Sequence, residues 1–209
     1  MSASLNAEKR VRDVFVIGAS AGGIRAVIEV LSHLPVDLPA FVGVVIHRGA
    51  ASTSDWSHTL GSKSEVRVVE PKSGDALVNG VVYIAPADCH MTFRDGQIRL
   101  DGGAKEHHTR PAVDPLFISA AQEYGPRVVG MVLTGGGHDG MEGLISVTAA
   151  GGISIVQKPS EAEHASMPEY AIAFDHVRAL LSVDEIGDMI ARLSRGEEVQ
   201  LDAEDRPHS

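Results

Sequence analysis

The sequence is poor in cysteine, in long apolar runs and in basic residues, and each shortage excludes a class of protein. Among 209 residues Cys89 is the single cysteine, which excludes an internal disulfide and is typical of a reducing compartment. No apolar run approaches the ~20 residues that a membrane-spanning helix needs. Residues 1–12 are polar and charged, unlike a signal peptide. We therefore predict a cytoplasmic protein without membrane insertion.

The shortage of basic residues argues against nucleic acid as a partner. Eighteen Lys and Arg residues against 28 Asp and Glu residues give a formal net charge of -10, whereas binding to phosphates needs clustered positive charge. The 10 histidines are scattered and show no H-x-x-x-H spacing, and the neighbours His107 and His108 would point apart in an extended chain. We predict neither a nucleic-acid site nor a metal site.

What the chain does contain is a serine in a distinctive turn. Residues 14–17 form a short run of β-branched and aromatic residues, and G-x-S-x-G follows at 18–22. Helical spacing of apolar residues then extends over 24–34. A sharp strand-to-helix turn exposes Ser20 as a nucleophile for acyl transfer, and the helix N-terminus offers unpaired N–H groups to an oxyanion.

The same residues allow three other interpretations to be compared: a dinucleotide-binding turn, a P-loop and a structural turn. A dinucleotide-binding turn fails because Ser20 occupies the second glycine position of G-x-G-x-x-G. A P-loop fails because Ile24 and Arg25 stand where Lys and Ser or Thr are required. A purely structural turn remains open.

Strand-like runs alternate with helical segments, which predicts an α/β fold with a mostly parallel sheet and helices on both faces. Asp95-Gly96 predicts an antiparallel hairpin at the sheet edge. We expect one domain over 13–194, with flexible tails at 1–12 and 195–209. The predicted strands are 14–17, 41–46, 66–69, 81–84, 128–133, 153–156 and 177–181. The predicted helices are 24–34, 51–61, 111–124, 141–149, 167–173 and, from a capping box at 182–185, up to about 193.

Three polar residues lie at the carboxyl ends of predicted strands: Ser20 after 14–17, His47 after 41–46, and Asp139 after 128–133. Because the carboxyl ends of parallel strands meet at one edge of a sheet, these side chains can converge as nucleophile, base and orienting carboxylate. Ser20 Oγ is then expected within ~3 Å of a His47 ring nitrogen. The alternatives are a core histidine at 47, His138 as the base, and Asp139 as an N-cap.

Other residues are candidates for binding the substrate. The N–H of Ala21 follows the serine, and Gly136 and Gly137 belong to a loop that is either a flexible turn or a surface for close approach of a substrate. Arg110 is either a ligand for an acidic group or a structural or solvated residue. Asp114 is expected to complement the dipole of its helix from the first turn.

Four segments together resemble the catalytic domain of the chemotaxis protein-glutamate methylesterase, CheB, over about 14–193. They are IGASAGG at 17–23, YIAPAD at 83–88, RPAVDPLF at 110–117 and LTGGGHDG at 133–140. The resemblance implies a doubly wound α/β domain with a catalytic triad of Ser20, His47 and Asp139. It also implies hydrolysis of glutamate methyl esters, with possible deamidation of glutamines, on a methylated chemoreceptor-like protein, and no cofactor.

The chain departs from this family pattern at three places. Ala21 stands where the family usually has Thr, Gly136 where Met is common, and His47-Arg48-Gly49 where His-Met-Pro or similar is usual. The full-length family form also carries an N-terminal receiver domain, which we do not expect here from the short segment before residue 13. Rival hypotheses are a non-catalytic scaffold homologue and a small-molecule esterase.

Overall fold

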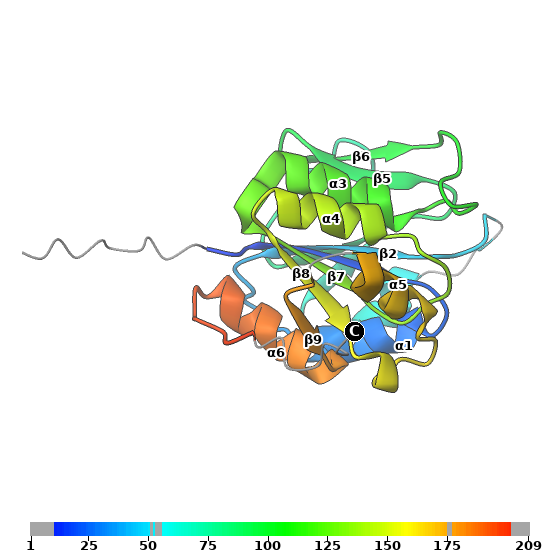
Figure 1. The fold of residues 1–209 in the computed structure, drawn as a ribbon. Coiled ribbons are helices and arrows are strands. Elements are labelled where there is room, and N and C mark those ends of the chain that lie inside the picture. Colours follow the sequence, from blue (N-terminus) through cyan, green and yellow to red (C-terminus); the bar gives the residue numbers. More distant parts are fainter. Residues whose placement is uncertain (1–10, 51, 53–55, 175–176, 202–209) are drawn as a thin grey trace, which may run out of the picture.

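A parallel sheet forms the centre of the molecule. The computed structural model describes residues 11–50, 52, 56–174 and 177–201, and its seven-stranded sheet has the order β3-β4-β2-β1-β7-β8-β9 (Figure 1). All neighbouring strands pair in parallel, and the order winds outward from β1 in both directions. The doubly wound α/β prediction is confirmed. The strands are β1 Val14–Ala19, β2 Phe41–Ile46, β3 Arg67–Val69, β4 Val81–Ile84, β7 Val128–Val132, β8 Ile153–Gln157 and β9 Ala179–Leu181.

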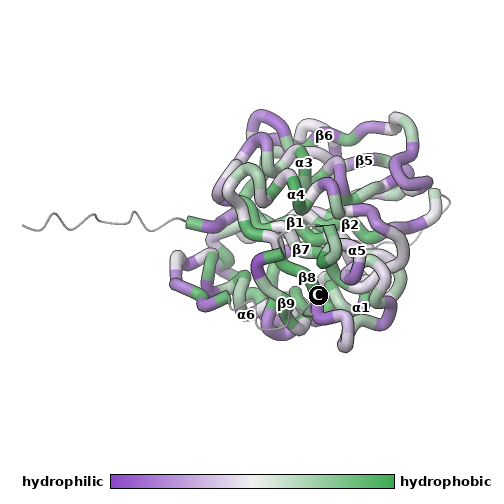
Figure 2. Tube along the Cα trace, in the orientation of Figure 1, coloured by the Kyte–Doolittle hydropathy of each residue, from purple (hydrophilic) through white to green (hydrophobic). Residues whose placement is uncertain are grey.

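The central strands are apolar at consecutive positions because helices cover both faces of the sheet. In β1, Phe15 and Ile17 pack into one core, whereas Val14 and Val16 pack into the other. Figure 2 shows hydrophobic colour concentrated in these strands between the helical layers. Alternate residues of β1 therefore pack against the helices on opposite faces of the sheet.

The helices divide between the two faces as Figure 1 shows, with α3 and α4 above the sheet and α1 and α6 below it. The capping box that opens α6 is present: Ser182 Oγ accepts from Glu185 N at 3.1 Å, and Ser182 N donates to Glu185 Oε2 at 2.7 Å. The helices are α1 Gly23–Ser32, α2 Trp56–Gly61, α3 Val113–Tyr124, α4 Met141–Ala149, α5 Ser166–Phe174 and α6 Val183–Ser194. No helix within the described ranges has both the length and the apolar character needed to cross a membrane.

The hairpin forms as predicted, but its predicted place at the sheet edge is wrong. Strands β5 His90–Arg94 and β6 Gln97–Asp101 make a separate antiparallel sheet. Phe93 packs edge-on against Phe41 of β2 and Tyr124 of α3, at centroid distances of 5.7 and 6.5 Å. Ser119 Oγ of α3 also accepts from Phe93 N at 3.1 Å. The hairpin therefore lies over the α3 face, where Phe93 is buried.

Two predicted boundaries also differ from the structure. Leu201 is buried in the same core cluster as residues of α1 and α6, so packing against the domain continues beyond residue 194. Of the predicted helix over 51–61, the structure shows α2 from Trp56, and residues 51 and 53–55 lie outside the described ranges. Residues 1–10 and 202–209, within the predicted tails, also lie outside them.

Candidate active site

The carboxyl ends of three central strands bring Ser20, His47 and the 134–140 loop together. β1 and β2 pair in register up to Ala19 opposite Ile46, so Ser20 and His47 follow at adjacent positions. The main chains stay paired there, because His47 N donates to Ala19 O at 3.0 Å. On the other side Ser20 N donates to Thr134 O at 3.0 Å. Ser20 is thus fixed between the ends of β2 and β7.

His47 forms a short contact with Asp139, as predicted for a base and its orienting carboxylate. Their Nε2 and Oδ2 atoms lie 2.6 Å apart. The side chain of His47 is 12% exposed and that of Asp139 is 2% exposed. An ionised Asp139 can only accept a hydrogen bond, so His47 Nε2 carries the proton and donates it. In the neutral imidazole, Nδ1 is then the nitrogen that can accept a proton.

The Asp139 carboxylate is held at the N-terminus of α3. Its Oδ2 accepts from Val113 N at 2.7 Å, and its Oδ1 accepts from Asp114 N at 3.0 Å. Burial acts to raise the pKa of Asp139, but the hydrogen bonds from His47 and from these backbone N–H groups outweigh it and lower that pKa. Asp139 is therefore ionised at neutral pH.

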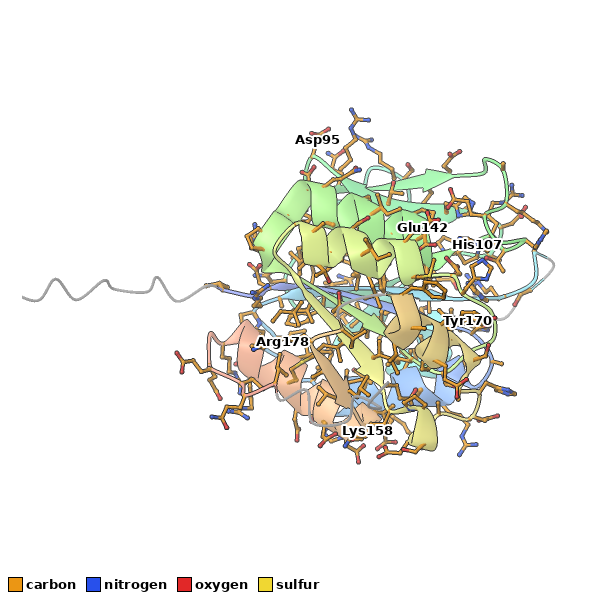
Figure 3. The ribbon with its side chains drawn as sticks, in the orientation of Figure 1. Asp95, His107, Glu142, Lys158, Tyr170 and Arg178 are labelled. Atoms are coloured by element: carbon orange, nitrogen blue, oxygen red, sulfur yellow. The ribbon has the colours of Figure 1, made fainter. Side chains whose placement is uncertain are left out.

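These contacts bear on the alternatives for Asp139 and His138. Asp139 does cap a helix, but the helix is α3, whereas Gly140 is the N-cap residue of α4. The His138 ring lies edge-on to His107, with centroids 4.6 Å apart, and to Tyr170, at 6.1 Å. Figure 3 shows His107 and Tyr170 on the same side of the molecule. Asp139 pairs with His47 and not with its neighbour.

The predicted hydrogen bond between Ser20 and His47 is not formed in this structure. Among the described residues, neither Ser20 Oγ nor His47 Nδ1 has a hydrogen-bond partner. Catalytic hydrogen bonds are often long in unliganded enzymes and shorten when substrate binds. Ser20 Oγ and His47 Nδ1 thus lie at adjacent strand ends without a hydrogen bond to another described residue.

The backbone beside Ser20 offers open hydrogen-bond donors. Within the described chain, the N–H groups of Ala21, Gly136 and Gly137 have no acceptor, whereas Gly135 N donates to His164 O at 2.9 Å. A side chain added at Gly136 or Gly137 would meet nothing within 4 Å. Gly136 and Gly137 are thus exposed, with unpaired N–H groups, in the loop whose residue Gly135 lies against Ser20.

Among the residues that the structure describes, two groups of side chains have the spacing of a metal site. The ligand atoms of His107, Asp114 and Asp139 lie within 4.8 Å of one another, as do those of Glu29, His33 and Asp184. In the first group every carboxylate oxygen already accepts an N–H hydrogen bond or faces a histidine nitrogen. A cation there would have to displace these contacts. The second group lies between α1 and α6, where His33 contacts Asp184 at 3.5 Å.

Comparison with known proteins identifies the family. The model of the CheB methylesterase family matches residues 15–190. The chain belongs to the CheB methylesterase family. The crystal structure of the Thermotoga maritima CheB methylesterase catalytic domain is 32% identical and superposes with a TM-score of 0.82, covering 87% of this chain and 98% of that one.

Two longer CheB relatives are also similar. A Methanosarcina mazei protein named protein-glutamate methylesterase/protein-glutamine glutaminase 2 is 36% identical over 92% of this chain and 54% of its own length. A protein of the same name from Anaeromyxobacter dehalogenans is 40% identical over 88% of this chain and 54% of its own length. The chain thus spans about half the length of these two relatives.

Arg110 of this CheB-family domain is engaged within the protein. Its guanidinium donates to Asp88 Oδ1, at 2.9 Å from Nε, and to the carbonyl oxygens of Gly102, at 2.8 Å, and Gly103. These bonds join the 102–112 loop to the end of β4. They favour the structural role that the sequence left open for Arg110, and its assignment to substrate binding stays an untested prediction.

The sequence analysis did not detect the contact between His107 and Asp114. Asp114 does lie in the first turn of α3, as expected, but its Oδ2 is 2.9 Å from His107 Nε2 and its Oδ1 accepts from Gly143 N at 2.7 Å. No spacing signal marks this pair, because His107 belongs to an irregular loop in which its φ is 48°. The contact places the His107 side chain against Asp114, whose backbone N–H donates to Asp139.

Gly135→Ala is expected to lower ester hydrolysis at least about tenfold, because the new Cβ would lie 2.7 Å from both Ser20 Cβ and the Met167 sulfur. Gly49→Ala is the matched control, since a Cβ at Gly49 meets nothing within 4 Å. Turnover of an activated ester, with a thermal melt of each variant, checks this. Equal activity of the two variants would show that Gly135 does not position Ser20.

Proposed function

We propose that this CheB-family chain is a serine carboxylic-ester hydrolase in which Ser20 is the nucleophile, His47 the base and Asp139 the orienting carboxylate. The observation that carries the proposal is the 2.6 Å contact between His47 Nε2 and the buried Asp139. His47 directly follows β2, which pairs with β1 next to Ser20. A buried carboxylate that fixes the imidazole tautomer is what activation of a serine requires.

The reaction follows from the positions of these groups. Ser20 Oγ attacks the ester carbonyl carbon while its proton passes to His47 Nδ1, and Asp139 stabilises the imidazolium that forms. The N–H groups of Ala21 and the Gly136–Gly137 loop donate to the oxyanion. The bond from carbonyl carbon to alkoxy oxygen then breaks, and the alcohol leaves with the proton from His47. Water then attacks the acyl carbon and gives a proton to His47. The bond from that carbon to Ser20 Oγ breaks as His47 returns the proton to Ser20, which releases the carboxylic acid and restores the free serine.

The proposed substrate is the methyl ester of a glutamate side chain in a methylated chemoreceptor-like protein. The support is the name of the two similar proteins from Methanosarcina mazei and Anaeromyxobacter dehalogenans, protein-glutamate methylesterase/protein-glutamine glutaminase 2. Methanol is then the leaving alcohol, and for a glutamine side chain ammonia takes its place. A cytoplasmic location, expected from the sequence, is part of this proposal.

The experiment is methanol release from a methyl-esterified receptor fragment, run beside turnover of an activated ester. Release of methanol with a matching gain of glutamate carboxylates supports the proposal. Turnover of the activated ester alone identifies an esterase with a different substrate. Turnover of neither, by protein that is folded, would contradict catalysis and favour a non-catalytic scaffold.

A further inference from the structure

A second histidine–aspartate pair lies directly behind the first. His107 Nε2 is 2.9 Å from Asp114 Oδ2, and the backbone N–H of Asp114 donates to Asp139 Oδ1 at 3.0 Å. The backbone of Asp114 is thus hydrogen-bonded to the Asp139 carboxylate, and that carboxylate holds His47. Asp114 is 1% exposed, so its charge is weakly screened by water.

The two aspartates cap each other's helices. Asp139, just before α4, accepts from N–H groups in the first turn of α3, and Asp114, in the first turn of α3, accepts from Gly143 N in the first turn of α4. Gly143 permits this approach, because a Cβ there would lie 2.4 Å from Phe117 Cβ. Small movements at Asp114 would therefore be transmitted to Asp139 through well-packed helices.

The ionisation of Asp114 is sensitive to its partners. Burial first, and then the charge of Asp139, raise the pKa of Asp114 to about 6, while hydrogen bonds from Gly143 N–H and His107 oppose the rise. Asp114 thus carries its charge above about pH 6 and loses it below. Four other titratable groups surround His107 and Asp114. They are Asp139 and its partner His47, His138, whose ring packs against His107, and the buried His90. His90 Nδ1 accepts a hydrogen bond from Ala112 N at the start of α3.

We propose that His107 and Asp114 are positioning residues for the His47–Asp139 pair. The backbone N–H of Asp114 orients the Asp139 carboxylate, and His107 holds the Asp114 side chain so that its negative charge adds to that of Asp139. Two carboxylates then stabilise the imidazolium that His47 becomes when Ser20 loses its proton. This inference rests on the proposed function in taking His47 as the base.

Asp114→Asn separates this role from a purely structural one. The amide keeps an oxygen for Gly143 N–H and an NH₂ group for His107 in its other tautomer, but it removes the charge. We expect kcat to fall about tenfold with KM within about twofold. The acid limb of kcat/KM is expected to move to lower pH by about 0.5 unit, because His47 loses a neighbouring negative charge. At pH 8 the variant is expected to melt no lower than the wild-type protein, since a buried charge is removed.

Substitutions at His107 test the other half of the pair. His107→Leu removes the group facing Asp114 and is expected to lower kcat at pH 7 severalfold, because the pKa of Asp114 then rises further. His107→Gln, which supplies a donor that does not titrate, is expected to restore most of that loss. His108→Leu is the matched control, since His108 is exposed, and its activity is expected to be unchanged.

A measurement without catalysis separates this inference from the proposed function. The NMR titration midpoint of the His47 imidazole is expected to fall by about 0.5 unit in Asp114→Asn, whether or not the chain hydrolyses the receptor ester. An unchanged midpoint in a folded variant would overturn the positioning role. Lack of methanol release by the wild-type protein, with the midpoint shifted, would instead contradict only the proposed substrate.

Discussion

Ser20→Ala is expected to lower kcat for ester hydrolysis at least about 10³-fold while the protein remains folded. The hydroxyl has no hydrogen-bond partner among the described residues, so its removal leaves no buried group unsatisfied. Substrate binding, which depends on backbone donors, should change little. Steady-state kinetics on an activated ester, with circular dichroism to verify the fold, measures both effects.

Ser62→Ala is the control for this substitution. Ser62 is an exposed serine whose Oγ donates to Thr59 O at 2.7 Å, and its loss is expected to leave kcat unchanged. Activity of Ser20→Ala close to that of Ser62→Ala would rule out Ser20 as the nucleophile.

Asp139→Asn is expected to lower kcat by about 10³–10⁴-fold. Asp139 Oδ2 faces both the His47 ring and Val113 N–H, and a carboxylate accepts from both donors. An amide has one oxygen for the donors that surround it, so an NH₂ group must face a ring nitrogen or a backbone N–H. His47 is then driven to the wrong tautomer, and the α3 N-terminus loses a hydrogen bond.

The same substitution is expected to lower the melting temperature at neutral pH. Because the folded pKa of Asp139 lies below its ordinary value, its ionised form stabilises the fold above the unfolded pKa. That contribution is lost as the pH falls through the folded pKa, so the difference in melting temperature between variant and wild type should shrink in acid. Asp188→Asn, which alters the exposed 3.1 Å contact with His33, is the matched control. A kcat equal to that of this control would contradict the assigned role of Asp139.

Much of the fold could be predicted because parallel strands covered on both faces must be apolar at consecutive positions. β1, β2 and β7 satisfy that condition over their full lengths, so the sequence predicts where their carboxyl ends lie. Parallel pairing then predicts that Ser20 and His47 lie at neighbouring strand ends, as the register of β1 with β2 shows.

The parts that could not be predicted depend on contacts between loops. Arg110 pairs with Asp88 and His107 with Asp114 because the 102–112 loop folds back, with positive φ at both His107 and His108. Histidine adopts positive φ more often than most residues other than glycine, but such cases are still only a small fraction, so two adjacent histidines do not predict this loop conformation. The hairpin was misplaced for a related reason, since an Asp-Gly turn predicts pairing between two strands but not the surface on which they pack.

The most direct test of the account is where, and how fast, a fluorophosphonate attaches to the protein. The account predicts a single adduct, mapped by mass spectrometry to Ser20, and a labelling rate at least about 100-fold lower in His47→Ala. An adduct on a different residue, or equal labelling of Ser20 with and without His47, would contradict it.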